Sequence, residues 1–153
     1  MNKFPIKNTL LMPISPKVLA RISSSEQRFI FRRTMPRQPF SRIILFKCQK
    51  SPRVIMEVLP GHIYQHPIEE FKRHFFRHSC MQPPEWKAYW FEAVRGIAIA
   101  VQSFVVIPEE KRYNPVDFFK LKQAPQNYCY VQGVAWPLGH PRFPQDIPED
   151  CFL

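Results

Sequence analysis

The most apolar run of the chain covers residues 88–108, yet it contains Glu92, Arg95 and Gln102. On a helical wheel of about 100° per residue, these polar side chains and Gly96 gather in one stripe about 120° wide. Apolar side chains cover the rest of the circumference, whereas a surface helix of a soluble protein has the reverse proportion. The pattern predicts a single transmembrane helix, and the alternative is a buried helix in a soluble α domain.

The polar stripe of this helix is expected to be the side that meets partner proteins. Its small residues permit a close approach of two helices, and Glu92 and Arg95 can pair with each other near the membrane edge. More Lys and Arg residues flank the run closely on its N-terminal side, which predicts that the N-terminus lies in the matrix of a mitochondrion. The expected partner-contact seam consists of Glu92, Arg95, Gly96, Ile99, Gln102 and Ser103.

Shorter patterns predict a few local elements outside this run. Residues 66–80, HPIEEFKRHFFRHSC, have Pro67 at a first helical position, acidic residues in the first turn and basic residues toward the end, as a helix favours. This helix is either interfacial or an ordinary amphipathic helix of a soluble protein, since both show the same narrow apolar face. Residues 42–47, RIILFK, and residues 127–139, NYCYVQGVAWPLG, each predict at most one short strand.

The composition argues against a large independent core. The chain has 153 residues with 17 Pro and only 4 Gly, and the prolines leave few windows for a helix or a central strand. We therefore predict an all-α membrane protein with a single transmembrane helix, a short amphipathic helix and extended Pro-rich arms. Its expected parts are a basic matrix-side arm (1–60), an amphipathic interfacial helix and linker (61–84), the transmembrane helix (85–108) and an extended intermembrane-space tail (109–153).

The formal net charge of +10 comes from the N-terminal part of the chain. Residues 1–56 carry twelve Lys or Arg against the single Glu26, and the remaining 97 residues carry ten basic and eleven acidic side chains. A basic, acid-poor N-terminus is typical of a mitochondrial targeting segment. The main alternative is a basic arm that binds phosphate, because residues 27–42, QRFIFRRTMPRQPFSR, interleave Arg with aromatic side chains as nucleic-acid-binding extensions do.

A group of four histidines and one cysteine suggests a metal site at first sight. Two histidine pairs have the i, i+4 spacing that places both rings on one face of a helix, and zinc accepts His and Cys ligands. Neighbouring Lys and Arg residues disfavour the binding of a cation, so we predict no metal site and expect interfacial histidines. The residues concerned are His62, His66, His74, His78 and Cys80.

The remaining patterns give no sign of an active site. The four cysteines form no CxxC pair, but Cys129 and Cys151 share the expected intermembrane-space side and could form a disulfide; free buried thiols are the alternative. The sequence has no nucleophile–base arrangement, no phosphate-binding glycine loop and no paired-carboxylate site. We therefore expect a protein that is not an enzyme, without catalytic residues and without a cofactor.

One short stretch resembles a known family. Residues 89–108, YWFEAVRGIAIAVQSFVVIP, resemble the start of the MWFE accessory subunit of mitochondrial respiratory complex I, NADH:ubiquinone oxidoreductase. Here 89 residues precede the Trp-Phe-Glu with which the family begins, and Arg95 stands where a proline commonly precedes the glycine. The resemblance implies a membrane-arm subunit with a scaffold and assembly role and no chemistry of its own. The matching positions are Trp90, Phe91, Glu92, Gly96, Ile97 and Ala98.

These features together predict a non-catalytic accessory subunit of the complex I membrane arm, located in the mitochondrial inner membrane. Its expected partners are the core and accessory subunits of that complex and the inner-membrane lipids, and nucleic acid is not among them. One alternative is an accessory subunit of another inner-membrane respiratory complex. The other is a basic mitochondrial ribosomal protein that binds rRNA, which would make nucleic acid the partner of the N-terminal arm.

Overall fold

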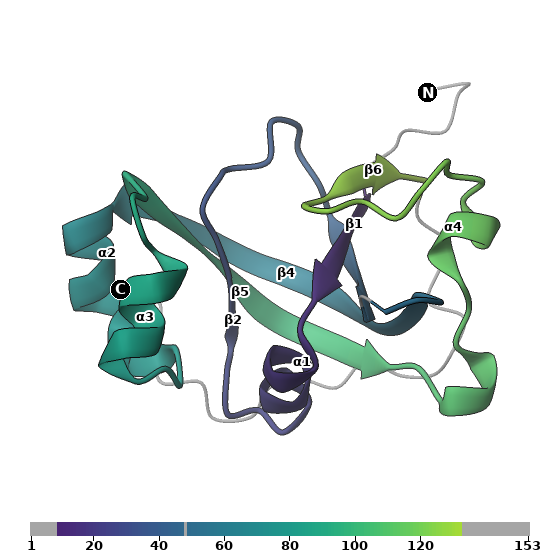
Figure 1. The fold of residues 1–153 in the computed structure, drawn as a ribbon, viewed down its shortest axis with the longest axis horizontal. Coiled ribbons are helices and arrows are strands. Elements are labelled where there is room, and N and C mark those ends of the chain that lie inside the picture. Colours follow the sequence, from purple (N-terminus) through teal and green to yellow (C-terminus); the bar gives the residue numbers. More distant parts are fainter. Residues whose placement is uncertain (1–8, 48, 133–153) are drawn as a thin grey trace.

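The computed structural model describes residues 9–47 and 49–132, and these residues form one mixed β-sheet with helices around it (Figure 1). The sheet has six strands in the order β2-β5-β4-β3-β1-β6. The strands are β1 (Thr9–Ile14), β2 (Phe29–Arg32), β3 (Arg42–Lys47), β4 (Arg53–Pro67), β5 (Arg95–Val106) and β6 (Cys129–Val131). The helices are α1 (Pro16–Ser23), α2 (Ile68–Phe75), α3 (Pro83–Tyr89), α4 (Pro115–Phe118) and the 3-10 helices η1 (Phe76–His78) and η2 (Glu109–Lys111).

The two longest strands, β4 and β5, are neighbours in the sheet and extend between the end that carries α2 and α3 and the end that carries α4 (Figure 1). They pair antiparallel from Met56 opposite Val106 to Pro67 opposite Arg95. The register shifts on both sides of Pro60, which has no N–H to donate to the ladder. β3 pairs antiparallel with β4, whereas β1 pairs in parallel with β3. The connection from β1 to β3 therefore crosses the molecule, and it contains both α1 and β2.

Residues 95–106, which the apolar pattern predicted to be part of a transmembrane helix, form strand β5 instead. Ile97 and Ile99 belong to the core on one face of this strand, and Ala98 and Ala100 belong to the core on the other face. A strand that is buried on both faces presents the same continuous apolar run as a buried helix. The prediction of an all-α membrane protein is therefore wrong. In the part of the chain that the structure describes, no helix is long and apolar enough to span a bilayer.

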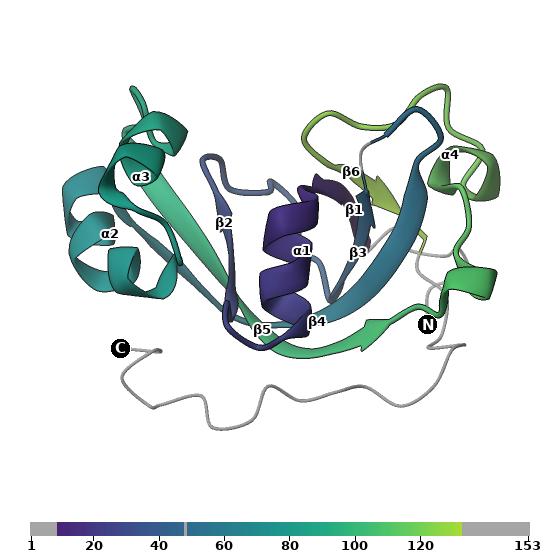
Figure 2. The ribbon, with the colours of Figure 1, turned by 60° about the horizontal axis from the view of Figure 1, so that its bottom comes forward.

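Helix α1 lies against the curled sheet and covers its largest apolar core (Figure 2). The helix begins at Pro16, and the hydroxyl of Ser15 caps it by accepting a hydrogen bond from the N–H of Val18 at 3.2 Å. Leu19 and Ile22 are its buried residues, and they pack with side chains from β1, β2, β3, β4 and β5. This core therefore joins β1 to β2, which do not pair with each other in the sheet.

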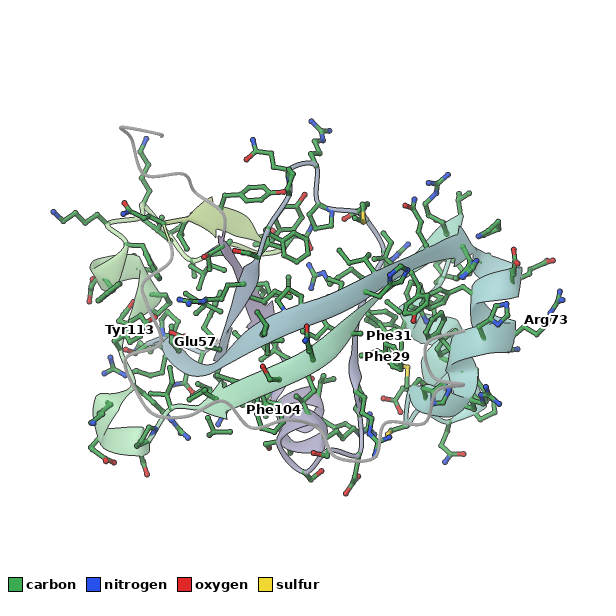
Figure 3. The ribbon with its side chains drawn as sticks, turned by 180° about the vertical axis from the view of Figure 1, so that it is seen from behind. Phe29, Phe31, Glu57, Arg73, Phe104 and Tyr113 are labelled. Carbon is green, nitrogen blue, oxygen red and sulfur yellow. The ribbon has the colours of Figure 1, made fainter. Side chains whose placement is uncertain are left out.

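A second core consists mostly of aromatic rings and lies between one end of the sheet and helices α2 and α3. Phe29 and Phe31 of β2 point toward these helices (Figure 3). The ring of Phe31 meets that of Phe71 edge to face at a centroid distance of 5.8 Å, and Phe71 meets Trp90 at 5.0 Å. Edge-to-face pairs of this kind stabilise a core beyond the area that they bury. Trp90 thereby fixes the start of the turn that leads from α3 into β5.

Three local predictions are confirmed by the structure. The RIILFK stretch forms strand β3 with the predicted bounds, and the short strand β6 lies within the stretch predicted to contain one. The predicted amphipathic helix is α2, with Glu69 and Glu70 in its first turn and with Phe71 and Phe75 buried. Because these two phenylalanines pack into the aromatic core, the apolar face of α2 is directed to the protein itself.

Candidate functional site

The candidate site is a cleft between β1 and β2, the two strands that α1 connects. Three strands separate β1 from β2 in the sheet, so the sheet has to curl to bring them together. Both strands line one pocket of about 170 Å³, which we call the apolar pocket: β1 contributes Met12 and Ile14, and β2 contributes Ile30 and Phe31. Figure 2 shows α1 between the two strands on this side of the sheet. The cleft therefore exists only when the whole sheet has formed.

A larger and more polar pocket of about 540 Å³ continues the cleft toward α3 and β5. We call it the arginine pocket, because its charged lining groups are three guanidinium groups and one carboxylate. The two pockets share Arg32 and Tyr89 in their linings, so they lie next to each other. The arginine pocket is lined by Arg32, Arg33, Thr34, Tyr89, Glu92, Ala93, Val94, Arg95 and Asn127.

Arg32 joins the two pockets. It is the last residue of β2, and its Nη2 donates a hydrogen bond to the backbone oxygen of Asn127 at 3.0 Å. Burial lowers the pKa of its guanidinium, and the nearby Tyr89 and Tyr128 act in the opposite direction. An arginine remains protonated at neutral pH in proteins. The structure thus holds a permanent positive charge where the polar part of the cleft meets the apolar part.

Arg33 and Arg95 supply the other two positive charges. The Nη2 of Arg33 donates a hydrogen bond to the backbone oxygen of Phe91 at 2.7 Å, which ties Arg33 to the turn between α3 and β5. Arg95 is exposed at the first position of β5. Glu92 lies in the same turn and has a φ of 59°, in the left-handed region. The rim of the arginine pocket therefore presents two cationic groups and one anionic group close together.

The ring of Tyr89 lines both pockets. Its hydroxyl donates a hydrogen bond to the backbone oxygen of Phe31 at 2.8 Å, and its ring packs edge-on against Trp90 at a centroid distance of 4.8 Å. Burial raises the pKa of the phenol, while Arg32 and Arg33 act in the opposite direction. Tyr89 is therefore neutral at physiological pH, and it offers the cleft a fixed aromatic surface.

Gln27 is a polar residue in the lining of the apolar pocket, although it is only 2% exposed. Its Nε2 donates a hydrogen bond to the backbone oxygen of Phe29 at 2.8 Å, whereas its Oε1 has no partner among the described residues. A buried acceptor that lacks a donor costs about 1–3 kcal/mol. A ligand that reaches this oxygen with an N–H or O–H group would remove that cost.

The residues of the predicted partner-contact seam do not share one face of β5. Gly96 lies under the ring of Phe71, while Ile99 belongs to the largest apolar core, on the opposite face of the strand. Gln102 is exposed and Ser103 is fully buried. The seam assumed a repeat of 3.6 residues, but side chains alternate every two residues in a strand. The other two members of the seam, Glu92 and Arg95, do lie together, because both line the arginine pocket.

The histidines and cysteines singled out in the sequence lie outside the cleft. The rings of His66 and His74 are 5.2 Å apart, and the Nδ1 of His66 is 3.9 Å from a carboxylate oxygen of Glu70. Among the described residues no group of three His, Cys, Asp or Glu side chains is arranged to hold a metal ion. Cys129 lies in β6, while Cys151 falls outside the described residues. The absence of a metal site and the disulfide both stay predictions.

Sequence reasoning missed most of the cleft. Its arginines at positions 32 and 33 belong to residues 27–42, whose mixture of Arg and aromatic side chains was the one available signal. That signal was assigned to an extended arm, whereas the stretch contains strand β2. Gln27 and Asn127 gave no signal, because nothing in the sequence indicates that the segments around them approach each other.

Comparisons with known proteins place the fold. No family model and no curated protein matches the sequence. Among solved structures, a point mutant of the ASCH protein from Zymomonas mobilis superposes with a TM-score of 0.68 at 17% identity, over 84% of this chain and 91% of that chain. Another structure of ASCH from the same organism gives a TM-score of 0.65 at 16% identity, over 82% and 89% of the two chains. The chain therefore has an ASCH-like fold.

The ASCH-like fold overturns the assignment to complex I. The stretch that resembled the MWFE subunit is not one helix: Trp90 follows α3, Phe91 and Glu92 lie in the turn, and Ile97 and Ala98 face opposite sides of β5. The predicted role as a respiratory accessory subunit, in complex I or in another complex, is therefore wrong. The single-pass location in the mitochondrial inner membrane and the membrane-complex and lipid partners are wrong as well, and the ribosomal alternative has no support.

Proposed function

We propose that this chain is an RNA-binding domain that holds a single-stranded segment in the cleft between β1 and β2. The observation that carries the proposal is the lining of the cleft: three arginines line one pocket, and the apolar pocket beside it is lined by Gln27, whose Oε1 is an unpartnered acceptor. Guanidinium groups bind phosphate oxygens through paired, charge-assisted hydrogen bonds. The ASCH-like fold supports RNA as the nucleic acid. Nucleic acid, which the sequence prediction kept only for its ribosomal alternative, thus becomes the favoured partner.

The apolar pocket favours an unpaired base over a duplex. Its volume of about 170 Å³ is small, and its acceptor, the Oε1 of Gln27, is buried. Only a base that has left its partner can bring an N–H group of its edge to an acceptor inside a pocket. Arg32, at the boundary of the two pockets, is placed to bind the phosphate that belongs to such a base. We therefore expect a duplex of the same sequence to bind more weakly than the single strand.

We also propose that the cleft binds RNA without cleaving it. Cleavage by general acid–base catalysis needs a group that accepts a proton near neutral pH. The arginines of the pocket do not accept protons, and burial raises the pKa of Tyr89 away from the neutral range. Glu92 is the single carboxylate in the lining of the arginine pocket, and it lies at the exposed rim.

The binding proposal is tested by comparing Arg95→Gln with the matched control Arg73→Gln. Arg95 lines the arginine pocket, whereas Arg73 is an exposed arginine of α2 that points into solvent (Figure 3). Both changes remove one positive charge. We expect R95Q to weaken the binding of a fluorescein-labelled single-stranded RNA roughly tenfold, because a hydrogen bond between charged groups is lost. R73Q is expected to change the affinity less than about twofold, with fluorescence anisotropy as the measurement.

Equal affinities of R95Q and R73Q for the RNA would contradict the proposal, because the arginine pocket would then hold no phosphate. The labelled RNA is also recovered after incubation with the wild-type chain and examined on a denaturing gel. We expect it to keep its full length. A shortening that grows with time and disappears in R95Q would show that the cleft cleaves RNA.

A further inference from the structure

We propose that the turn between α3 and β5 is a stacking platform for a second, unpaired base of the bound RNA, with the ring of Phe91 as its surface. This inference rests on the proposed function and adds a base subsite at the rim of the arginine pocket. Phe91 is 65% exposed, and Val94 in the same turn is 79% exposed. Two large apolar side chains in one short turn thus face solvent beside a cationic pocket.

The exposure of Phe91 does not come from a loose turn. The preceding Trp90 is buried in the aromatic core, and the backbone oxygen of Phe91 accepts the hydrogen bond from Arg33 at 2.7 Å. On the other side of the turn, the N–H of Ile68 donates to the backbone oxygen of Val94 at 2.9 Å. The backbone of the turn is therefore fixed at both ends, and it presents the side chain of Phe91 at a defined place on the surface.

The conformation of this turn is unfavourable for stability. Glu92 occupies the left-handed region with a φ of 59°, where a residue with a Cβ atom meets steric strain. The neighbouring Phe91 and Val94 leave most of their surface exposed to solvent in this arrangement. Strained backbone and exposed apolar groups occur preferentially at functional sites, where binding makes use of them. Here Glu92 and Val94 line the arginine pocket, and Phe91 directly precedes Glu92 in the chain.

The charges around the turn favour a base of RNA over a protein surface as the occupant. Arg33 and Arg95 flank the turn and attract the phosphates on either side of a stacked base. The carboxylate of Glu92 repels a phosphate, but it can accept hydrogen bonds from the N–H groups of a base edge. Every base has a π face, so stacking on an exposed ring tolerates any sequence. A neutral apolar partner would leave the two guanidinium groups without a counter-charge.

The test uses Phe91→Ala, Phe91→Trp and the matched control Phe118→Ala. Phe118 is also an exposed phenylalanine, 50% exposed at the end of α4, and it lies outside the cleft. We expect F91A to bind a single-stranded RNA about tenfold more weakly than the wild type, because one base loses its stacking partner. F118A should bind like the wild type. F91W should keep the affinity, and the fluorescence of its new, exposed indole should fall when RNA binds.

A second probe locates the stacked base within the RNA. A series of the same single-stranded RNA carries one abasic nucleotide at successive positions. For the wild type we expect the affinity to fall at two positions, one for the apolar pocket and one for the turn. In F91A the loss at one of these two positions should disappear, because the base that is missing there has no ring to stack on. F118A should retain both positions.

The outcomes separate this inference from the proposed function. If F91A binds RNA like the wild type while R95Q binds poorly, the stacking platform is wrong and RNA binding in the cleft stands. If neither F91A nor R95Q loses affinity, both proposals are wrong. Light scattering tests the rival occupant, a protein surface. If the wild type self-associates and F91A abolishes this self-association without any change in RNA affinity, the turn is a protein interface and the stacking platform is wrong.

Discussion

At the scale of single residues, the least usual feature outside the cleft is the carboxyl group of Glu57 in the middle of β4. The residue is only 2% exposed, and neither of its carboxylate oxygens has a hydrogen-bond partner among the described residues. The hydroxyl of Tyr113 is buried nearby and also lacks one (Figure 3). Burial raises the pKa of Glu57, and Arg42 opposes that shift. Burial and the neighbouring Glu57 also raise the pKa of Tyr113. The protonated, neutral form of Glu57 is therefore the form that suits the folded chain.

We expect Glu57 to make the free energy of unfolding decrease as the pH rises. A carboxyl group whose pKa is higher in the folded state than in the unfolded state stabilises the folded state only while it is protonated. Its contribution is complete below the unfolded pKa of about 4.5 and is lost as the pH rises through the raised pKa of the folded state. The side chain in Glu57→Gln cannot ionise. E57Q should therefore become more stable relative to the wild type as the pH rises from about 4 to 8.

Urea unfolding at several pH values measures this difference. The matched control is Glu110→Gln, which removes an exposed carboxylate in η2. E110Q should follow the pH dependence of the wild type. If E57Q follows it as well, the carboxyl group of Glu57 titrates alike in the folded and unfolded states, and the burial argument fails.

At the scale of elements, the prolines show how a composition can mislead. Their number predicted a chain with few regular elements. In the structure, Pro16, Pro83 and Pro115 stand at the first positions of α1, α3 and α4, where a missing N–H costs nothing. Pro60 lies where the register of β4 and β5 shifts, and Pro67 precedes α2. These prolines mark boundaries of elements, and they are compatible with a folded core.

The sequence was sufficient to predict elements with a strong local signal, but it was insufficient to predict strand β5. Helix α2 shows acidic residues at its start, basic residues at its end and a narrow apolar face, all of which the structure confirms. Strand β5 is covered on both faces, so its apolar run lacks the alternation that identifies a strand. On a helical wheel the polar residues of this stretch formed one stripe, which looked helical. Two of them lie outside the interior of the strand: Glu92 belongs to the turn before β5, and Arg95 is the first residue of β5.

Close packing of β5 against α2 leads to a prediction at Gly96. A Cβ atom at this position would lie 2.4 Å from the ring of Phe71, which is itself packed against Phe75 and Trp90 at centroid distances of 4.8 and 5.0 Å. Because the ring cannot move without displacing its neighbours, we expect Gly96→Ala to lower the free energy of unfolding by about 1–3 kcal/mol. Denaturation in urea measures the change.

The control for this prediction is Gly61→Ala in β4. A Cβ atom there would meet its nearest side-chain atom at 3.3 Å, which a small adjustment can accommodate. G61A should therefore destabilise the chain clearly less than G96A. Equal losses would mean that the methyl group at position 96 is accommodated by a shift of α2, contrary to the packing argument.

At the scale of the whole molecule, the cleft is a product of topology. β1 and β2 meet because a curled sheet and the α1 crossover bring them together, and neither strand carries a sign of this in its own residues. The position of the positive charge in the molecule is likewise set by the fold. Residues 1–56 carry all of the excess positive charge, +11 against −1 for the remaining residues, which predicted an arm outside any core. In the structure the described part of this region supplies α1, β1, β2 and β3, and two of its arginines line the cleft.

This concentration of charge predicts how RNA binding depends on salt. Each phosphate that a single strand binds through a cationic side chain contributes about −0.7 to the slope of log K against log salt concentration. Three arginines in contact with phosphates therefore predict a slope of about −2 or steeper for the wild type. R95Q should make the slope less steep by about 0.7, because one contact is lost, whereas R73Q should leave it unchanged. Anisotropy titrations at several salt concentrations measure the slopes. If R95Q and R73Q reduce the slope equally, the RNA responds to the net charge of the molecule and not to the arginine pocket, and the cleft is not the place where the phosphates bind.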